Sequence, residues 1–488
     1  AAQAARFHLQ SQIMNHYPVP YYSPMVHVLL ALMVVGATAV DYTPYLLPLK
    51  REVVPVMKNG RTVSHRSAFY GTISVGGPDP QQFSVVFDTG SGHVVVPSVE
   101  CTNATCMEHR RYNISRSASG LAINSDGTPV PPDELCDQVT IGFGTGTVKG
   151  EFAREKVCMG SPTRALCSDV TIVMAVEMSE QPFRSFTFDG LFGLGLSSLS
   201  LAPEFSFFGQ LAAGGASSAH AVPSRFGIFL TDCEDGKGSE IAIGGYNAAR
   251  LAGPLTWAPV VKPKLGYWQV QVKAVRVDGR DLGICKNNAC TAILDTGTSH
   301  LGVPHHIKQG LSDMLTVDAP AGTNNDCRSA TAPALDIDLG DFTIALLPKD
   351  YMRREPLNRT NKTGLPCGST PSSGQACSSR CTPRLMPVNM MAPLGPNLFI
   401  FGEPILHRYY TVYDWLAPRI GFGIAQKQTG TTGNEGEHQH RHPSAEVPTP
   451  PTAGVDAGAN GDAEDLAAQD SHIFLMQLSS QLVHSTRL

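Results

Sequence analysis

The sequence contains one short pattern twice. Residues 86–97 read V-F-D-T-G-S-G-H-V-V-V-P, and residues 293–304 read I-L-D-T-G-T-S-H-L-G-V-P. In each copy two apolar residues lead into Asp-Thr-Gly, a hydroxyl residue follows, and then a histidine and Val-Pro. The repeat places Asp88 and Asp295 in equivalent settings. Two carboxylates held close together cannot both ionise, so one keeps its proton while the other acts as a base. The repeat therefore predicts a carboxylate pair suited to acid–base hydrolysis.

The composition favours short strands over long helices. The chain has 488 residues, room for two or three domains, with 47 glycines and 36 prolines. Hydrophobic residues make up 42% and charged residues 16%, which permits a sizeable core. The formal net charge of −5 gives no nucleic-acid footprint. We expect no nucleic acid, no metal and no other cofactor.

Cysteine spacing and sequons point to export. Of 12 cysteines, Cys101 and Cys106 form one closely spaced pair, and Cys285 and Cys290 another. Such pairs in an exported protein are typical of disulfides. Zinc binding is the alternative, but neither pair is a C-x-x-C and no matching histidine pair follows. The candidate glycosylation sequons begin at Asn103, Asn113, Asn358 and Asn361.

The N-terminal residues predict targeting. The uncharged apolar run Met25–Val40 contains Ala37-Thr38-Ala39, a pattern typical of signal peptidase sites. We expect residues 1–39 to hold a signal peptide and the protein to be secreted or luminal, in a vacuole- or lysosome-like compartment. A retained signal anchor is the alternative, and the only case with membrane attachment. Residues 40–64 include the basic Lys50-Arg51. They are either a short pro-segment that covers an acidic site or an extended N-terminal strand.

Beyond Ala68 the pattern predicts β-structure. Apolar runs alternate with Gly-Pro turns. Strands are expected at 138–143, 170–176, 225–230, 240–244, 267–277, 342–347, 399–401 and 409–414, and short helices at 199–211 and 305–315. The repeated aspartate motif predicts two related lobes, residues 65–237 and 238–425.

The composition changes again in the C-terminal part. Residues 426–470 are rich in Gly, Thr, Pro, Ala and acidic residues and are expected to be disordered. The cluster E-H-Q-H-R-H at 437–442 is interpreted as a solvated linker rather than a weak metal site. Residues 471–488 regain apolar side chains. We expect an amphipathic helix or a sorting segment there, too short and polar to span a bilayer.

Several further motifs occur in a fixed order between Ala68 and Ala425. They are I-G-F-G-T-G-T-V-K-G from Ile141, F-D-G-L-F-G-L-G from Phe188, G-Y-W-Q from Gly266 and F-I-F-G-E-P-I-L-H-R-Y-Y-T-V-Y-D from Phe399. With the two D-T-G motifs, this stretch resembles the pepsin-like (A1 family) eukaryotic aspartic endopeptidases. The resemblance implies an all-β, bilobal fold of two pseudo-symmetric, barrel-like lobes with the active site between them. It also implies polypeptide substrates and a monomer.

The resemblance assigns roles to the motif residues. Asp88 and Asp295 would share a proton and activate a water, without a covalent intermediate. The glycines after them let the backbone approach the carboxylates, two hydroxyls bond the outer carboxylate oxygens, and two threonines tie the loops together. These supporting residues are Thr89, Gly90, Ser91, Thr296, Gly297 and Thr298.

Substrate contacts follow from the same resemblance. A flap hairpin would contribute Phe143, Gly144 and Thr145, while Phe188 and Leu191 would line a pocket for bulky apolar side chains. Tyr267 is a weaker candidate, for which a core role is equally open.

The chain departs from the family pattern in two ways. The flap has Phe143 in place of tyrosine, and Val95 stands where a tryptophan usually partners it. The two substitutions predict a flap geometry and an inhibitor sensitivity that differ from those of the family. His93 and His300 follow the two aspartates at equal spacing, and we favour structural roles over pH sensing for both.

The resemblance also suggests disulfides Cys101–Cys106 and Cys285–Cys290. Cys327 is paired with Cys367, with Cys377 or Cys381 as alternatives. No partners are assigned to Cys136, Cys158, Cys167 and Cys233.

The sequence thus predicts an aspartic endopeptidase that works in acid. The alternative is a non-catalytic peptide-binding or inhibitory relative. It is disfavoured because both D-T-G motifs are intact.

Overall fold

Strands dominate the computed structural model of the chain. It describes residues 43–58, 61–132, 134–160, 165–215, 223–231, 238–319, 326–354, 357–358, 379–426 and 474–484. These described residues group into one compact unit. The expected disordered stretch 427–470 and the apolar run Met25–Val40 lie outside the described residues.

The N-terminal half supplies eleven of the described strands. They are β1 (Tyr45–Lys58), β2 (Arg61–Val75), β3 (Gln81–Asp88), β4 (Val94–Pro97), β5 (Leu121–Ile123), β6 (Gln138–Phe143), β7 (Gly146–Met159), β8 (Leu166–Met178), β9 (Gly190–Gly193), β10 (Arg225–Phe229) and β11 (Ser239–Ile243).

The C-terminal half supplies the others. They are β12 (Thr256–Pro259), β13 (Gln269–Val272), β14 (Ala274–Val277), β15 (Arg280–Asp281), β16 (Cys290–Leu294), β17 (Leu301–Pro304), β18 (Val317–Asp318), β19 (Leu335–Asp338), β20 (Thr343–Leu346), β21 (Leu357–Asn358), β22 (Ser379–Cys381), β23 (Leu385–Val388), β24 (Leu398–Phe401), β25 (Tyr409–Asp414), β26 (Arg419–Ile424) and β27 (Gln477–Val483).

The helices are short. The α-helices are α1 (Ala104–Met107), α2 (Phe207–Gly215), α3 (His305–Leu315), α4 (Pro348–Tyr351) and α5 (Glu403–Leu406). Single 3₁₀ turns, among them η4 (Pro203–Phe205), lie in the connections. None of the helices in the described ranges is long and apolar enough to cross a membrane.

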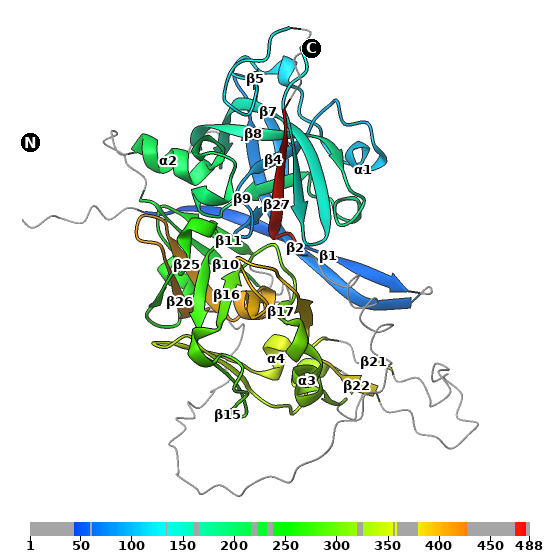
Figure 1. Ribbon diagram of the computed structural model, residues 1–488, viewed down its shortest axis with the longest axis vertical. Coiled ribbons are helices and arrows are strands. Elements are labelled where there is room, and N and C mark those ends of the chain that lie inside the picture. Colours follow the sequence, from blue (N-terminus) through cyan, green and yellow to red (C-terminus); the bar gives the residue numbers. More distant parts are fainter. Residues whose placement is uncertain are drawn as a thin grey trace, which may run out of the picture. The chain divides into compact units, whose positions relative to one another are not determined.

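The same strand topology surrounds each aspartate. In the N-terminal lobe β3 runs parallel to β9, and β4 runs antiparallel to β9. In the C-terminal lobe β16 runs parallel to β24, and β17 runs antiparallel to β24. All of these strands except β3 are fully buried, which explains their continuous apolar runs, and β3 is buried over its last four residues. The matching arrangements confirm the expected all-β, bilobal fold (Figure 1).

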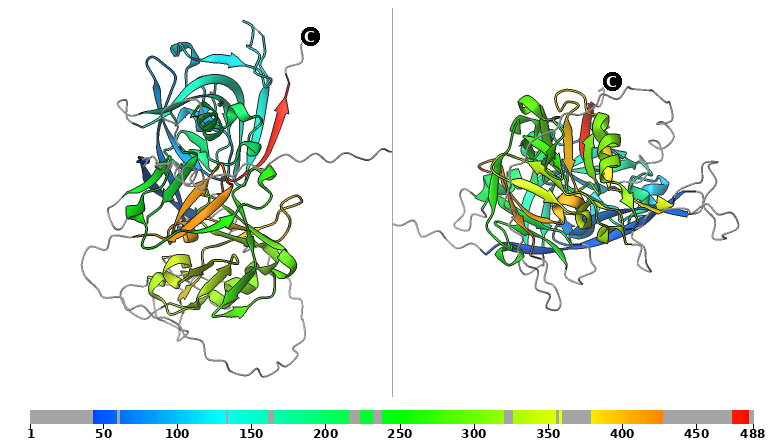
Figure 2. Two further views of the ribbon diagram at one scale, coloured as in Figure 1. Left: turned by 90° about the vertical axis from the view of Figure 1, so that its left-hand side faces the viewer. Right: turned by 90° about the horizontal axis from the view of Figure 1, so that it is seen from below.

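The ribbon of β1 and β2 takes the N-terminal segment into the main sheet. β1 pairs with β11 through Tyr45–Leu49 and with β2 through Lys50–Lys58. The described part of residues 40–64 is therefore extended strand, and a pro-segment role for it stays a prediction. The main sheet begins at β12 and ends at β27, whose neighbour is β6 (Figure 2). The last described segment of the chain thus forms an edge strand of the N-terminal lobe.

A cluster of aromatic side chains packs next to the loop that carries Asp88. The Phe226 and Tyr413 rings stack with centroids 4.6 Å apart, and Trp268 meets Tyr413 edge-on at 5.1 Å. Trp268, which is fully buried, donates its indole N–H to the Leu194 carbonyl at 2.8 Å. Leu194 in turn donates its backbone N–H to the Asp88 carbonyl at 2.8 Å. Packing from the C-terminal half therefore reaches the first aspartate loop.

Four disulfides occur in the described residues. Cys101–Cys106 and Cys285–Cys290 are both present, and Cys158 pairs with Cys167. The first choice for Cys327, Cys367, is wrong: its partner is Cys381, one of the two alternatives. Cys381 ends β22 and Cys327 opens a 3₁₀ turn, Cys327–Ser329, so the bond joins two regular elements. Cys136 has no disulfide partner within the described ranges, and Cys233, Cys367 and Cys377 lie outside them.

Of three expected helices, one is confirmed and two are wrong. The helix at 305–315 has the bounds of α3. The helix at 199–211 is wrong at its start, because Pro203 opens the short 3₁₀ turn η4 and α2 begins only at Phe207. The expected amphipathic helix at 471–488 is also wrong, because Gln477–Val483 form β27.

Candidate active site

The two aspartates stand at the ends of buried strands. Asp88 is the last residue of β3, Asp295 follows β16 directly, and both are 0% exposed. The Gly90 backbone N–H donates to Asp88 Oδ1 at 2.9 Å, and the Gly297 N–H donates to Asp295 Oδ1 at 2.8 Å. Each carboxyl is therefore held by the tight turn of its own motif.

The glycines also place the two carboxyls across from each other. A methyl group on Gly90 would lie 2.8 Å from Cγ of Asp295, and one on Gly297 would lie 2.7 Å from Oδ1 of Asp88. Such contacts leave no room for a side chain, so each loop needs glycine at this position. The structure thereby brings Asp88 and Asp295 together at one place.

Thr89 and Thr296 connect the loops beneath the carboxyls. The Thr89 N–H donates to the Thr296 hydroxyl, and the Thr296 N–H donates to the Thr89 hydroxyl, both at 3.0 Å. The Thr89 hydroxyl also donates to the Leu294 carbonyl at 2.9 Å, and that of Thr296 to the Phe87 carbonyl at 2.6 Å. This reciprocal set fixes the relative position of the two motifs.

The outer carboxylate oxygens (Oδ2) of Asp88 and Asp295 differ in their hydrogen bonds. Thr298 donates its hydroxyl to Oδ2 of Asp295. Ser91 is the equivalent residue, but its hydroxyl is buried without a hydrogen-bond partner among the described residues and makes no such bond to Asp88. Oδ2 of Asp88 is buried without a hydrogen-bond partner among the described residues. This oxygen is the polar atom of the pair left for a reacting group.

The pair holds protons more tightly than ordinary aspartates. Burial raises the pKa of Asp88 well above its usual value, and the charge of Asp295 raises it further. Burial also raises the pKa of Asp295, although the hydrogen bond from the Thr298 hydroxyl, the neighbouring Asp88 carboxyl and the Gly297 N–H oppose the shift. The two carboxyls titrate as a pair, so the single-proton state belongs to both.

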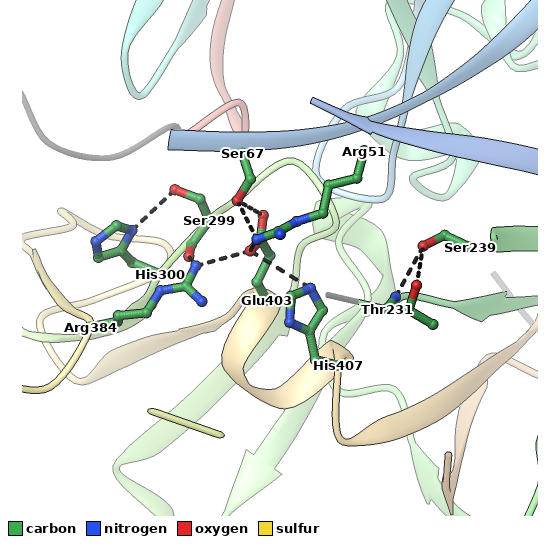
Figure 3. A network of polar contacts seen from close by, with 9 residues as sticks. All are labelled: Arg51, Ser67, Thr231, Ser239, Ser299, His300, Arg384, Glu403 and His407. Carbon is green, nitrogen blue, oxygen red and sulfur yellow. Dashed lines mark hydrogen bonds and ion pairs between the residues drawn. The ribbon is translucent and has the colours of Figure 1, made fainter. Parts of the chain in front are cut away.

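A buried ion-pair network supports the loop that follows Asp295 (Figure 3). Glu403 opens α5 and is 1% exposed. Arg384 donates to Glu403 Oε2 at 2.9 Å and also to the Ser299 carbonyl in the loop after Asp295. Ser67 of β2 donates to Glu403 Oε1, and Arg51 of β1 lies 3.6 Å from Oε2. The network therefore ties the N-terminal strands to the loop that carries Asp295.

The two residues that depart from the family pattern at the flap, Phe143 and Val95, pack in one apolar cluster. Phe143 ends β6, next to the Gly144-Thr145 turn, and Val95 lies in β4. Both side chains are buried in one hydrophobic cluster, and Phe143 meets Phe183 edge-on with centroids 6.2 Å apart. Hydrophobic packing thus takes the place of a hydroxyl hydrogen bond at the base of the flap.

The two histidines are buried but differently bonded. His93 Nε2 accepts the Leu201 N–H at 3.1 Å, so Nδ1 carries the proton and donates to Gln477 Oε1 at 3.1 Å. Burial lowers the pKa of His93 to about 4. His300 Nδ1 lies 3.1 Å from the Ser299 hydroxyl. His93 therefore stays neutral near pH 7 and orients neighbouring groups.

Residues 474–477 lie in the site, which the sequence reasoning missed. The Leu475 N–H donates to the Gly297 carbonyl at 3.3 Å, and the Gln477 N–H donates to the Gly90 carbonyl at 2.9 Å. The flap bonds the same segment from the other side: Gly144 N–H donates to the Met476 carbonyl at 3.2 Å and Thr145 N–H to that of Phe474 at 3.0 Å. The segment thus passes between the flap and the aspartate loops.

The pocket residues fit this placement. Phe188 and Leu191 are fully buried in the cluster that also holds Leu475. Tyr267 donates its hydroxyl to the Gln477 carbonyl at 2.7 Å and packs in the cluster with Phe474 and Met476. Burial raises the Tyr267 pKa to about 12, so the hydroxyl remains a donor.

Two of the sequon asparagines, Asn103 and Asn113, already make side-chain hydrogen bonds within the protein. Asn103 caps α1 by accepting the Cys106 N–H and also donates to the Met178 carbonyl at 2.8 Å. Asn113 accepts the Ser115 N–H at 3.0 Å. Asn361 lies outside the described residues. Glycosylation of Asn113 and Asn358 stays a prediction, and at Asn103 a glycan on Nδ2 would compete with the bond to the Met178 carbonyl.

Comparisons with known proteins agree with this geometry. A family model described as eukaryotic aspartyl protease matches residues 68–425. Mouse (Mus musculus) cathepsin E is 30% identical over 360 residues, covering 73% of this chain and 80% of the relative. Cathepsin E of Aquarana catesbeiana is 29% identical over 75% of this chain and 81% of its own. Mouse pepsin A-5 is 28% identical over 85% and 92% of the two chains.

Proposed function

Because the chain belongs to the eukaryotic aspartyl protease family and is an aspartic-type endopeptidase, we propose that Asp88 and Asp295 hydrolyse peptide bonds by activating a water between them. The observation that carries this proposal is the buried carboxyl pair, with both pKa values raised and Oδ2 of Asp88 unpartnered among the described residues. Burial and pairing are what keep one carboxyl protonated while the other is ionised.

The reaction needs one acid and one base. The ionised carboxyl takes a proton from the water as the oxygen attacks the scissile carbonyl carbon. The protonated carboxyl donates to the carbonyl oxygen and then helps to protonate the leaving amine. The C–N bond breaks, the water oxygen stays on the new carboxyl, and no bond to the enzyme forms. The Thr89–Thr296 tie supports this scheme, because it keeps both loops fixed during proton transfer.

Specificity for apolar side chains is part of the proposal. The pocket that contains Phe188 and Leu191 is apolar and takes up a leucine side chain in the structure. We therefore expect preference for bulky apolar residues on the N-terminal side of the scissile bond. A hollow of about 600 Å³ beside the flap, lined by Gly144, Thr145 and His305 among others, gives room for further substrate residues.

We expect a bell-shaped pH profile with its maximum in acid. The raised pKa of the pair means that its single proton is retained above the usual aspartate range and lost as the pH rises through that raised pKa. At the acid end a second proton removes the base. Initial rates on a fluorogenic apolar peptide, from about pH 2 to about pH 8, measure this. Activity that increases steadily toward neutral pH would contradict the assignment.

Cleavage of a denatured protein in acid tests the function itself. The full chain and its Leu475→Asp variant are assayed together, because Leu475 lies against the aspartate loops. We expect cleavage that depends on acid and is abolished by Asp295→Ala. Intact substrate with every form of the correctly folded chain would support the non-catalytic alternative instead.

The proposed compartment is the secretory pathway. Four disulfides in the described residues support an oxidising environment. The substrates are polypeptides, and we propose that the chain acts as a monomer.

A further inference from the structure

We propose that the chain's own C-terminal segment, residues 474–483, is a peptide ligand of the catalytic cleft and excludes other peptides while it is bound. The inference rests on the proposed function, because it concerns the same cleft. It goes further by identifying an occupant and the side chains that the cleft selects.

The backbone of the segment is bound on both sides. The aspartate loops accept N–H groups of Leu475 and Gln477, while the flap donates N–H groups to the carbonyls of Phe474 and Met476. After Gln477 the segment continues as β27, antiparallel to β6 from Gln477↔Phe143 to Val483↔Gln138. This is strand addition to a sheet edge, which is a common way for proteins to bind extended peptides.

The direction of the carbonyls fixes the register. In an extended segment successive carbonyls point to opposite sides. Those of Phe474 and Met476 point to the flap, so the Leu475 carbonyl points to the floor that holds Asp88 and Asp295. The Leu475–Met476 peptide bond therefore stands where a scissile bond would stand.

The side chains alternate between the lobes in the same way. Leu475 is fully buried in the N-terminal lobe's cluster with Phe188 and Leu191. Phe474 and Met476 pack in the other cluster, with Tyr267 of the C-terminal lobe. All three apolar side chains are thus buried, Leu475 in one cluster and its two neighbours in the other, as expected for a bound peptide rather than a segment lying on a surface.

Gln477 occupies a polar subsite made for an amide. Its Oε1 accepts from His93 Nδ1 at 3.1 Å and from the Gly92 N–H at 3.3 Å, and its Nε2 donates to the Leu199 carbonyl at 3.0 Å. The side chain is 4% exposed, so these bonds form away from water. A carboxylate would face the Leu199 carbonyl, and an apolar side chain would leave the donors unpaired. The subsite therefore selects glutamine.

Binding of this segment and binding of a substrate exclude each other. A second peptide would need the same Gly90 and Gly297 carbonyls and the same flap N–H groups, which are already used. Because the segment belongs to the same chain, it competes without depending on protein concentration. The segment acts as an intramolecular inhibitor with the sequence Phe-Leu-Met-Gln in the cleft.

The test compares single substitutions in the full chain. Leu475→Asp puts a carboxyl into the apolar pocket, and Gln477→Ala removes the amide bonds. Gln481→Ala changes an exposed side chain of the same strand and serves as the matched control. We expect initial rates on a peptide substrate to increase about tenfold or more for Leu475→Asp and by less for Gln477→Ala. Gln481→Ala should match the wild type, and the wild-type rate per molecule should not change on dilution.

A second measurement does not depend on activity. A labelled synthetic peptide of residues 474–484 is titrated into the full chain carrying Leu475→Asp and Asp88→Asn, with fluorescence anisotropy as the readout. We expect saturable binding that is weakened about tenfold by Gln477→Ala in the peptide and unchanged by Gln481→Ala. If the wild-type peptide is cut by the Leu475→Asp enzyme, the cut should lie between Leu475 and Met476.

The outcomes separate this inference from the proposed function. Peptide binding without hydrolysis by any variant would support the ligand and refute the endopeptidase. Equal rates for wild type and Leu475→Asp, together with no peptide binding, would refute the ligand and leave the endopeptidase intact. A wild-type rate per molecule that increases on dilution would show that the segment acts between two copies, which contradicts the intramolecular account.

Discussion

Asp88→Asn is expected to lower kcat/KM for peptide hydrolysis by about 10²–10⁴-fold. Asparagine keeps the shape of the side chain but can neither act as the base nor hold the shared proton. The measurement is the initial rate on a fluorogenic peptide in acid, in the Leu475→Asp background so that the cleft is open. Asp336→Asn, in β19 of a separate sheet, is the matched control and should retain the parent activity.

The same variant should gain stability at neutral pH. The folded-state pKa of Asp88 is raised, so wild-type stability is fully present below the unfolded-state pKa and decreases as the pH rises through the folded-state pKa. Asparagine does not ionise, so the variant does not lose this stability as the pH rises. We expect a higher Tm than wild type at about pH 7 and equal Tm values well below the unfolded-state pKa. A lower Tm for Asp88→Asn at neutral pH would show that the carboxyl does not carry this burial penalty.

Glu403→Ala should destabilise the fold by about 3–5 kcal/mol, because it leaves the mostly buried Arg384 and Arg51 without their carboxylate. Arg384 also donates to the Ser299 carbonyl, so the loop that carries Asp295 should shift and activity should fall as well. Urea unfolding followed by tryptophan fluorescence measures the free energy.

An exposed ion pair is the control for Glu403. Glu180 and Arg184 lie 3.0 Å apart with side chains 71% and 47% exposed. Glu180→Ala should change the free energy of unfolding by less than about 0.5 kcal/mol. If the two substitutions have equal effects, the network beneath the second loop does not hold the lobes together.

The aspartate pair could be predicted from the sequence because neighbouring residues alone identify each aspartate. Each D-T-G lies between a buried strand and a tight turn, and the repeat itself indicates two equivalent sites. Strand and helix bounds were also predictable where the apolar period was regular: β6, β25 and α3 have the expected bounds. The expected strand at 267–277 is two strands, because the Lys273 N–H leaves the first pairing and donates to the Asp338 carbonyl.

Features set by distant partners could not be predicted. Cys327 had three candidate partners at similar distances along the chain, and the choice of Cys381 depends on the position of β22 relative to the turn that Cys327 opens. Residues 477–483 form a strand because the edge of β6 is there to pair with them. No periodicity in the segment itself carries that information. The role of Gln477 likewise appears only when His93 is seen beside it.

Mass spectrometry of peptide products is the most direct test of the central claim that both carboxyls perform the hydrolysis. A denatured protein is incubated in acid with the Leu475→Asp chain and with the same chain carrying Asp295→Asn, and new peptide ends are counted. The account predicts many new ends next to bulky apolar residues with the first chain and almost none with the second. Equal numbers of new ends with both chains would contradict it.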